Sequence, residues 1–446
     1  MKTISRVSYA LSLSAAAAML AGCGGLAQLP NPTAQTPLGI ESTVDRATPS
    51  SGTAKSNERS RYTKTILYSF RSGNDGIGPS GRLLDEGGTF YGETAAGGGS
   101  SGCYNPGPGC GTIFKLTPSR KKYAETILYQ FQGANGNDGQ VPSGGVVYKN
   151  GVLLGTTTYG GNYNLYACYY VGCGTVFKLP LSGSGSEQIL FAFSGTNGAV
   201  VSRGVIDKGG TLFGTTNYEG EYGYGTVFDL TPSGKDYTEN TLHEFADGSD
   251  GGLPPSGVTD ADGSLYGVTG VGGAHNYGTV YRLTPSGSGY TETILYSFTG
   301  GRDGKNPGAG VIDVNGSLYG TSGGGGAYNY GTVFKLTPSG SGYAESTLYS
   351  FKGGRDAEGT YSTLTEQGGT FYGTSEHGGL VNYGTVFKLT PAGSGYTESV
   401  IYRFKGGTDG ADPYWGVVAE KDGTLYSTTA TGGPFGNGTV FALTPH

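Results

Sequence analysis

The sequence predicts an all-β protein folded as a seven-bladed β-propeller, with four antiparallel strands in each blade. Of its 446 residues 88 are Gly and 20 are Pro, and only 14% are charged, a composition that excludes helical bundles and coiled coils. The 34 Tyr and 18 Phe supply apolar surface for a core, which argues against disorder. A unit of about 50 residues recurs seven times, and each copy holds four short strand-like runs, the pattern of a propeller.

The first 22 residues predict an export signal. Lys2 and Arg6 precede the apolar stretch 7–20, which is too short to remain in a bilayer as a spanning helix, so we expect a signal peptide over residues 1–22. It ends in Leu20-Ala21-Gly22-Cys23, which resembles the lipobox of bacterial lipoproteins. The alternative is an ordinary secretory signal with an incidental Cys.

The lipobox resemblance implies a membrane anchor. It implies that Cys23 is acylated and becomes the first residue of the mature chain, and Gly24 in place of Asp favours the outer membrane. We therefore expect a lipid-anchored protein of the cell envelope, on its periplasmic or surface-exposed face. Residues 23–60, rich in Pro, Thr, Ser, Ala and Gln, predict a flexible tether, and residues 61–446 the propeller.

Three short motifs recur in step along the folded part. Gly-Thr-Val-Phe or a close variant begins at Gly111, Gly174, Gly225, Gly278, Gly331, Gly384 and Gly438. A run of the type Thr-Ile-Leu-Tyr-Ser-Phe ends at Phe70, Phe131, Phe193, Phe245, Phe298, Phe351 and Phe404. Leu-Tyr-Gly-Thr-Thr or a similar run centres on Gly92, Gly155, Gly214, Gly267, Gly320, Gly373 and Ser427. We expect the Gly of this third motif to suit the narrow space where the blades converge, and the recurring Phe to pack between blades.

The fifth copy illustrates the four strands. The runs 310–313 and 317–321 flank an Asn-Gly turn, which is a strong hairpin signal. A Gly-rich loop leads to the run 331–337, and Pro338-Ser339-Gly340 turns the chain into the run 345–351. Each copy is therefore expected to form one blade.

The register of the repeats predicts how the ring closes. The folded part begins with a fourth strand, 65–70, and ends with a third strand, 438–444. Tyr62 matches the Tyr that precedes the fourth strand in other copies. We therefore expect residues 65–70 to complete the last blade, and an open solenoid with both ends uncapped is the alternative.

The run Tyr330-Gly331-Thr332-Val333-Phe334-Lys335-Leu336-Thr337-Pro338 and its copies resemble the GloVer tandem-repeat proteins of bacteria. The resemblance covers about residues 61–446. It implies export and a repeated fold, with an anchor that varies among members and is here the lipobox. It implies no established reaction.

The loops between the second and third strands are rich in Tyr, Asn and Gly, and they lie on the face of a propeller that usually carries the ligand. Tyr and Asn combine flat apolar area with hydrogen-bonding groups, which suits a saccharide or protein ligand. The candidate ligand-binding residues are Tyr222, Tyr224, His275, Asn276, Tyr277, Tyr328, Asn329, Tyr330, Asn382 and Tyr383. The alternative is that Tyr277, Tyr330 and Tyr383, which share one repeat position, only staple adjacent loops. Trp415, the only Trp, is either a ligand platform or a plug at the closure seam.

An acidic residue recurs five residues after the Phe of the fourth strand. The set consists of Asp75, Asp250, Asp303, Asp356 and Asp409, while Asp138 lies seven residues after its Phe and Asn197 stands in the third copy. Gly usually follows, which favours turns whose carboxylate accepts hydrogen bonds from nearby backbone amides, with no cofactor. The alternative is a ring of carboxylates near the channel mouth that holds a hard cation such as Ca²⁺.

Four Cys besides Cys23 fall in the same loop of two neighbouring copies. In the oxidising setting of an exported protein we expect the disulfides Cys103–Cys110 and Cys168–Cys173, each locking an enlarged loop. A zinc site built from all four is the alternative.

The sequence gives little evidence for catalysis. It has no His-Glu-x-x-His, no nucleophile elbow and no Cys-His pairing. His275 and His377, with Glu376 beside the latter, are the best candidates for a site assembled from scattered blades.

These features together favour a monomeric binding or surface-scaffold module for a saccharide or protein ligand. The alternative is an exported propeller enzyme of the lyase or lactonase type, with its site at the channel mouth. The net charge of −6 argues against a nucleic-acid partner.

Overall fold

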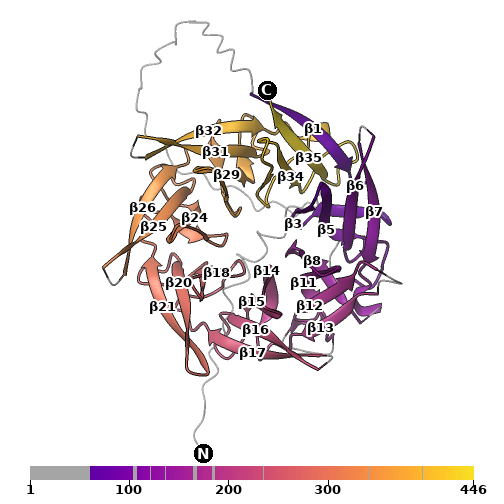
Figure 1. Cartoon of the computed structure of the whole chain (residues 1–446), viewed down its shortest axis with the longest axis horizontal. Coiled ribbons are helices and arrows are strands. Elements are labelled where there is room, and N and C mark those ends of the chain that lie inside the picture. Colours follow the sequence, from indigo (N-terminus) through magenta and orange to yellow (C-terminus); the bar gives the residue numbers. More distant parts are fainter. Residues whose placement is uncertain are drawn as a thin grey trace, which may run out of the picture. The chain divides into compact units, whose positions relative to one another are not determined.

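Seven β-sheets follow one another around a central axis, which confirms the predicted seven-bladed propeller (Figure 1). The structure, a computed structural model, describes residues 61–446 except 104–107, 121, 136, 164–167, 183–185, 235, 341 and 394. The predicted signal peptide over 1–22, Cys23 and the tether over 23–60 lie outside the described residues. Within the described part, no helix has both the length and the apolar character needed to cross a membrane.

The blades follow the order of the chain, and their strands run from the channel outward. Blade 1 consists of β2 (Gly76–Pro79), β4 (Leu84–Glu86), β5 (Thr89–Gly97), β6 (Thr112–Ser119) and β7 (Lys122–Gln130). Blade 2 consists of β8 (Gly139–Pro142), β10 (Val147–Lys149), β11 (Val152–Gly160), β12 (Thr175–Pro180) and β13 (Gln188–Ala192). Blade 3 consists of β14 (Ala199–Lys208), β15 (Thr211–Tyr218), β16 (Thr226–Ser233) and β17 (Asp236–Glu244).

Blade 4 consists of β18 (Thr259–Ala261), β19 (Ser264–Thr269), β20 (Thr279–Ser286) and β21 (Gly289–Ser297). Blade 5 consists of β22 (Lys305–Pro307), β23 (Ile312–Val314), β24 (Ser317–Gly324), β25 (Thr332–Ser339) and β26 (Gly342–Ser350). Blade 6 consists of β28 (Thr365–Gln367), β29 (Thr370–Ser375), β31 (Thr385–Ala392) and β32 (Gly395–Arg403). Blade 7 consists of β33 (Val418–Ala419), β34 (Leu425–Thr429), β35 (Thr439–Pro445) and β1 (Tyr62–Ser69). Two short pairs add to the blades, β3 (Gly81–Arg82) with β9 (Gly144–Gly145) and β27 (Ala357–Glu358) with β30 (His377–Gly378), as do the 3-10 turns Gly133–Asn135 and Gly407–Asp409.

The N-terminal strand completes blade 7, as predicted. β1 runs antiparallel to β35 from the pair Tyr62–Pro445 to the pair Ser69–Thr439. In Figure 1 the indigo β1 lies beside the yellow β35. The first and last strands of the described chain therefore close the ring, and the open solenoid is ruled out.

The innermost strand is more broken than the sequence predicts. In blades 1, 2 and 5 it is split into two pieces that pair with the same second strand. A Pro stands at each break, as Pro79, Pro142 and Pro307, and Pro has no N–H to give to the ladder. The residue before each of these Pro bonds with the neighbouring blade.

That bond joins the blades at all seven junctions. In each blade a backbone N–H of the innermost strand, or of the segment just before it, donates to the carbonyl that precedes the Gly-Thr-Val-Phe motif of the preceding blade, at 2.8–3.4 Å. The pairs are Gly78–Asn437, Val141–Cys110, Val200–Cys173, Leu253–Tyr224, Asn306–Tyr277, Gly359–Tyr330 and Asp412–Tyr383. The pair Gly78–Asn437 forms the same bond between blades 1 and 7, where the ring closes.

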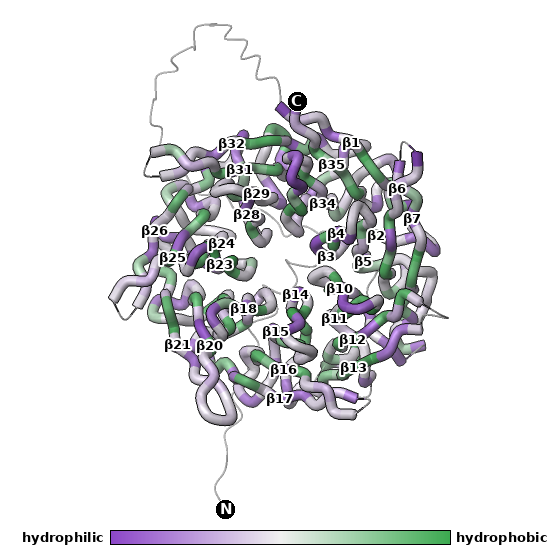
Figure 2. Tube along the Cα trace, in the orientation of Figure 1, coloured by the Kyte–Doolittle hydropathy of each residue, from purple (hydrophilic) through white to green (hydrophobic). Residues whose placement is uncertain are grey.

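The recurring Phe of the outer strand packs between blades, as predicted. All seven copies are fully buried. Each meets the ring of the third strand in the next blade edge to face, with centroids 4.9–5.3 Å apart, and Phe404–Phe441 and Phe70–Phe114 continue the pattern through blade 7. Figure 2 shows the apolar stretches along the strands of each blade that these rings belong to.

The recurring Gly of the second strand has a different role from the one predicted. A Cβ on Gly92 would lie 2.4 Å from the Phe114 ring, and one on Gly373 would lie 2.5 Å from the Phe387 ring. The Gly therefore makes room for an aromatic ring of its own blade rather than for the convergence of blades at the axis.

Candidate functional site

The Tyr residues before the Gly-Thr-Val-Phe motif staple adjacent loops. A Cβ on Gly300 would lie 2.4 Å from the Tyr277 ring, and a Cβ on Gly406 would lie 2.4 Å from the Tyr383 ring. Tyr330 covers Gly353 in the same way, at 2.7 Å. One side of each ring is therefore occupied by the loop that leaves the outer strand of the same blade, while the other side is exposed.

The three Asn of these loops are engaged in the turn itself. Asn276, Asn329 and Asn382 have φ of 60°, 64° and 61°, a left-handed conformation that Asn tolerates. The side-chain oxygen of each accepts the N–H of the residue four positions earlier, for example Gly272 at 2.9 Å and Gly378 at 2.8 Å. The structure therefore gives these three Asn a role in the turn, and their part in ligand binding stays a prediction.

Two of the predicted Tyr are open to a ligand and one is not. Tyr222 and Tyr328 are 53% and 54% exposed. Tyr224 instead packs against the core between blades 3 and 4. The outward face of the loops thus offers isolated rings rather than a continuous platform.

The recurring Asp is held by its own turn, as predicted, and also by a Tyr hydroxyl that sequence analysis missed. Asp303 accepts the Tyr296 hydroxyl at 3.0 Å and the N–H of Thr299 at 2.6 Å. Five copies repeat this bond from the Tyr two residues before the Phe, namely Tyr68–Asp75, Tyr129–Asp138, Tyr296–Asp303, Tyr349–Asp356 and Tyr402–Asp409. In blade 3 His243 takes the place of Tyr and contacts Asp250.

We expect Asp303→Asn to lower the free energy of unfolding by only about 1 kcal/mol, because the amide oxygen still accepts the turn bond. Asp303→Ala is expected to cost about 2 kcal/mol, because the Tyr296 hydroxyl loses its acceptor. Urea unfolding measures both. Excess Ca²⁺ is expected to leave the melting temperature unchanged, and a rise of many degrees would contradict the turn interpretation in favour of the calcium ring.

A Glu from the next blade lies beside most of these Asp residues. In each pair the charge of the Asp contributes, after burial, to raising the pKa of the Glu. The pairs are Asp75–Glu125, Asp138–Glu187, Asp250–Glu292, Asp303–Glu345 and Asp356–Glu398. Carboxyl groups of neighbouring blades therefore meet at five of the seven junctions.

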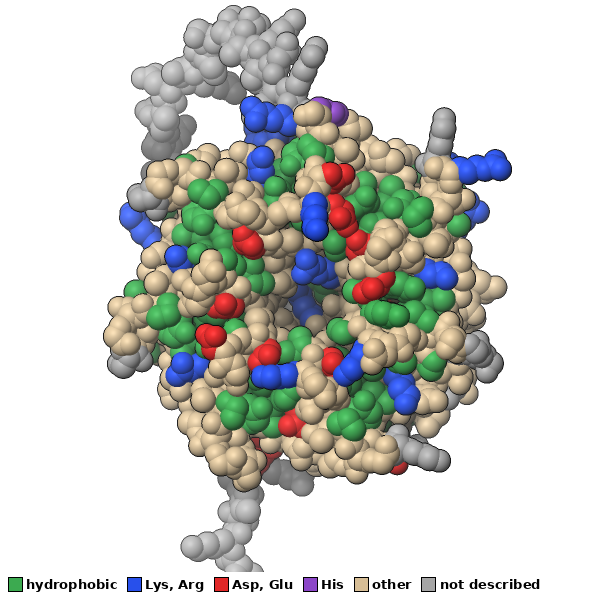
Figure 3. All heavy atoms as spheres, viewed as in Figure 1, with side chains coloured by type: hydrophobic (Ala, Val, Ile, Leu, Met, Phe, Trp, Pro, Cys, Tyr) green, Lys and Arg blue, Asp and Glu red, His purple; other side chains and the backbone are tan. Residues whose placement is uncertain are grey.

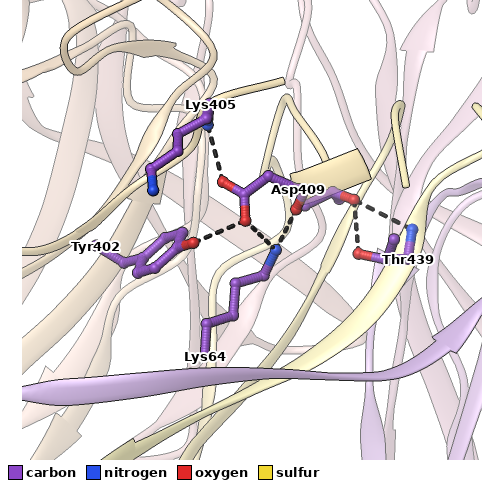
Figure 4. Close-up of polar contacts among 6 residues, drawn as sticks. Lys64, Tyr402, Lys405, Asp409 and Thr439 are labelled. Carbon is purple, nitrogen blue, oxygen red and sulfur yellow. Dashed lines mark hydrogen bonds and ion pairs between the residues drawn. The ribbon is translucent and has the colours of Figure 1, made fainter. Parts of the chain in front are cut away.

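The closure seam has a cation in place of this Glu. Lys64 of β1 lies 3.0 Å from Asp409, which also accepts the Tyr402 hydroxyl and the N–H of Lys405 (Figure 4). The Lys64 side chain is only 5% exposed, and its ammonium lies over the Phe404 ring, 4.8 Å from the centroid. Burial acts to raise the pKa of Asp409, but Tyr402 and Lys64 together lower it.

Both predicted disulfides are present. The Cα atoms of Cys103 and Cys110 are 5.2 Å apart, and those of Cys168 and Cys173 are 5.3 Å apart. Both separations suit a disulfide. Each bond locks the loop whose last Cys offers its carbonyl to the next blade, and the zinc site built from all four Cys is ruled out.

The candidate catalytic residues do not form one site. His275 is exposed in a loop of blade 4, and His377 is exposed on β30, beside blade 6. Burial raises the pKa of Glu376, which lies near enough to Arg203 and Asp412 to interact with both charges. The charge of the neighbouring His377 also acts on Glu376, whereas His275 lies in another blade.

The central channel holds a cavity of about 610 Å³ that residues from all seven blades line. Its wall is mainly Gly and Val, and its charged residues are Arg82, Arg203, Asp85 and Glu420. Figure 3 shows basic side chains inside the central hollow and acidic side chains around it. The cavity is thus cationic inside, with acidic groups near its mouth.

The two Arg residues reach across the channel to other blades. Arg82 of blade 1 donates to Thr365 Oγ1 of blade 6 and to the carbonyl of Val417, both at 3.1 Å. Burial lowers the pKa of Arg82. Among the described residues, neither Arg82 nor Arg203 forms an ion pair with a carboxylate.

Aromatic residues surround the guanidinium of Arg203. Its guanidinium donates to the carbonyl of Tyr361 at 2.6 Å and to the Tyr414 hydroxyl at 2.9 Å. It lies 4.9 Å from the centroid of the Tyr414 ring and 5.0 Å from that of Trp415. Trp415 Nε1 donates to the carbonyl of Pro79 at 3.0 Å, so this side chain both plugs the seam between blades 7 and 1 and lines the cavity.

Sequence analysis missed Arg82, Arg203, Tyr361 and Tyr414. A comparison of the repeat copies would have singled out these positions. Three residues directly precede the first buried aliphatic residue of the innermost part of each blade. In blades 2, 4 and 5 all three are Gly, Ser, Ala or Pro. Large side chains stand there only in blades 1, 3, 6 and 7, as Arg82, Arg203, Tyr361, Tyr414 and Trp415.

A comparison with protein families agrees with the repeat. The profile of the Gloeobacter/Verrucomicrobia repeat matches residues 104–309 and 288–446. Among curated proteins none matches this sequence.

Several solved structures are distantly similar to this chain. A proposed 6-phosphogluconolactonase from Bacteroides uniformis is 11% identical, with a TM-score of 0.44 over 72% of this chain and 82% of its own. An ancestral GH74 enzyme is 13% identical, with a TM-score of 0.45 over 83% of this chain and 51% of its own. PorZ, a surface component of the type-IX secretion system of Porphyromonas gingivalis, is 15% identical, with a TM-score of 0.39 over 77% of this chain and 44% of its own. Such distant similarity says nothing about activity.

Proposed function

Because this chain belongs to the Gloeobacter/Verrucomicrobia repeat family and its propeller encloses a cationic cavity, we propose that it is a lipid-anchored binding protein of the cell envelope. Its ligand is an acidic saccharide, which enters the central channel. The observation that carries this proposal is the pair Arg82 and Arg203, which line the cavity without forming an ion pair with a carboxylate among the described residues.

The donors and rings around the cavity suit such a ligand. A guanidinium has five N–H groups. The bonds to Tyr361 and Tyr414 use only part of the Arg203 set, so N–H groups remain for a carboxylate, which a guanidinium binds in a bidentate manner. The ring of Trp415, which lines the cavity, adds flat apolar surface for a sugar ring.

Isothermal titration with oligogalacturonate and with a neutral oligosaccharide of the same length tests the proposal. We expect binding of the acidic saccharide only, weakened tenfold to about a hundredfold by Arg203→Gln, because a charge-assisted hydrogen bond contributes about 1.5–3 kcal/mol. Arg302→Gln, which removes an exposed cation outside the cavity, is the matched control. Equal binding of both saccharides, or equal effects of the two substitutions, would refute the acidic-saccharide site.

The anchor is tested separately. We expect Cys23→Ser to prevent lipid attachment and to move the protein from the membrane fraction to the soluble fraction, because the lipobox supplies the only thiol proposed for acylation. Metabolic labelling with a fatty acid and fractionation of the envelope measure both. Unchanged membrane association of the variant would show that another feature holds the protein there.

A further inference from the structure

We propose that the junction of blades 3 and 4 binds a divalent transition-metal cation such as Zn²⁺, through His243, Asp250 and Glu292. His243 lies on β17 of blade 3, Asp250 follows in the turn after that strand, and Glu292 lies on β21 of blade 4. One ligand atom of each lies within 4.8 Å of the others. His243 Nε2 is 3.1 Å from Asp250 Oδ1 and 4.0 Å from Glu292 Oε1.

The three donors match the preference of this class of cation. Imidazole nitrogen and carboxylate oxygen are both ordinary zinc ligands, and a set of three leaves a position for water. The side chains of His243, Asp250 and Glu292 are 19%, 24% and 13% exposed, so water reaches the cluster although most of it is enclosed. A cation there also neutralises two carboxylates that otherwise face each other across the junction.

Two departures from the repeat meet at this junction. At the position of His243 the other copies carry Tyr68, Tyr129, Phe191, Tyr296, Tyr349 and Tyr402. At the position of Tyr281 the other copies carry Phe114, Phe177, Phe228, Phe334, Phe387 and Phe441. An imidazole and an additional phenol thus replace repeat residues on the two blades whose surfaces meet here.

Two buried polar atoms at the junction have no hydrogen-bond partner. Glu292 Oε1, which faces His243, is one of them, and the hydroxyl of the fully buried Tyr281 is the other. A hydrogen bond from His243 to Asp250 alone leaves Glu292 Oε1 unsatisfied, whereas a bound cation gives it a ligand role.

His243→Tyr is the matched variant, because it restores the residue that five other junctions combine with Asp. The full chain, purified without a histidine tag and stripped of metal, is titrated with ZnCl₂ by calorimetry and followed by thermal melting. We expect the unmodified chain to bind one Zn²⁺ more than His243→Tyr and to melt at a higher temperature when loaded. The variant is expected to lose at least about a hundredfold in affinity at this site, since even the loss of a residue behind a ligand costs 10–100-fold.

A second variant separates the loss of a metal ligand from the loss of the fold. Glu292→Gln keeps the size of the side chain but removes an anionic ligand, and we expect it to weaken Zn²⁺ binding while its circular dichroism stays unchanged. Equal Zn²⁺ binding by the unmodified chain and by a folded His243→Tyr variant would overturn the proposal. Failure of the unmodified chain to bind Zn²⁺ would overturn it as well, and neither result bears on the saccharide site.

Discussion

A chain that begins at Gly73, and so lacks β1, is expected to associate and to lose its cooperative unfolding transition. A chain that begins at Ser60 is expected to stay monomeric and to unfold in one transition. Without β1, the edge of β35 is left with unpaired backbone groups, which promotes association with other chains. Size-exclusion chromatography and thermal melting compare the two.

Deleting β1 also removes contacts outside blade 7. Phe70, at the end of β1, packs on Phe114 of blade 1. Lys64 pairs with Asp409, which follows the outer strand of blade 6. Removing β1 therefore breaks contacts in three blades at once. If the two chains behave alike in both measurements, the closure depends on other contacts.

Single substitutions test the seam without deleting a strand. Lys64→Met keeps the apolar stem but leaves Asp409 without its cation, and breaking such a buried pair is expected to cost about 3–5 kcal/mol. A cross-link reports the register. Thr63 and Thr444 are both exposed and directly opposite, so the pair Thr63→Cys and Thr444→Cys is expected to form a disulfide. A double variant that remains reduced under oxidising conditions would count against this register.

The sequence predicted the ring and its closure because the repeat is dense in local signals. The Asn-Gly turn of the fifth copy gives the hairpin of β23 and β24 as expected. The strand 65–70 pairs with the last third strand, as the register of the repeat predicts, but a register shift interrupts the pairing between Ile66 and Tyr68. Such a bulge depends on the twist of the finished sheet, which no local pattern records.

The candidate site was harder to predict, because the residues proposed for it depart from the repeat. Loops rich in Tyr and Asn matched a general pattern of binding surfaces, yet Asn276 closes a turn and Tyr277 staples one. Arg82 and Arg203 each occur once, at a position where most copies have a small residue. Residues from distant blades meet only after the ring has closed, so a search for linear motifs does not detect them.

The stability of the propeller is expected to fall as the pH rises from 5 to 9, because Glu side chains are buried beside Asp at the blade junctions. Burial, and then the charges of Asp75, Asp138 and Asp356 respectively, raise the pKa of Glu125 to about 7 and those of Glu187 and Glu398 to about 8. These values lie well above the ordinary value of 4.5.

The sign of the effect follows from proton binding. Between about pH 4.5 and 8 the folded protein holds protons on these groups that the unfolded chain has released, so the free energy of unfolding decreases as the pH rises. The stabilisation by these Glu is complete below their pKa in the unfolded chain. It is lost as the pH rises through their pKa values in the folded protein. For Asp409 the pH dependence of stability has the opposite sign. Its pKa is lowered in the folded protein, so its contribution to stability disappears only in strong acid.

Urea unfolding at pH 5, 7 and 9 measures the effect. One pKa unit corresponds to about 1.4 kcal/mol, and after a discount for water around these half-buried groups we expect a total loss of ~3–5 kcal/mol. The double variant Glu187→Gln and Glu398→Gln removes two of the titrating groups but keeps their size, so it is expected to be more stable than the unmodified chain at pH 9 and similar to it at pH 5. Glu86→Gln, which changes an exposed carboxylate, is the control and is expected to leave the pH profile unchanged. A profile that is flat from pH 5 to 9, or that rises, would mean that these carboxyl pairs are hydrated enough to ionise in the folded state.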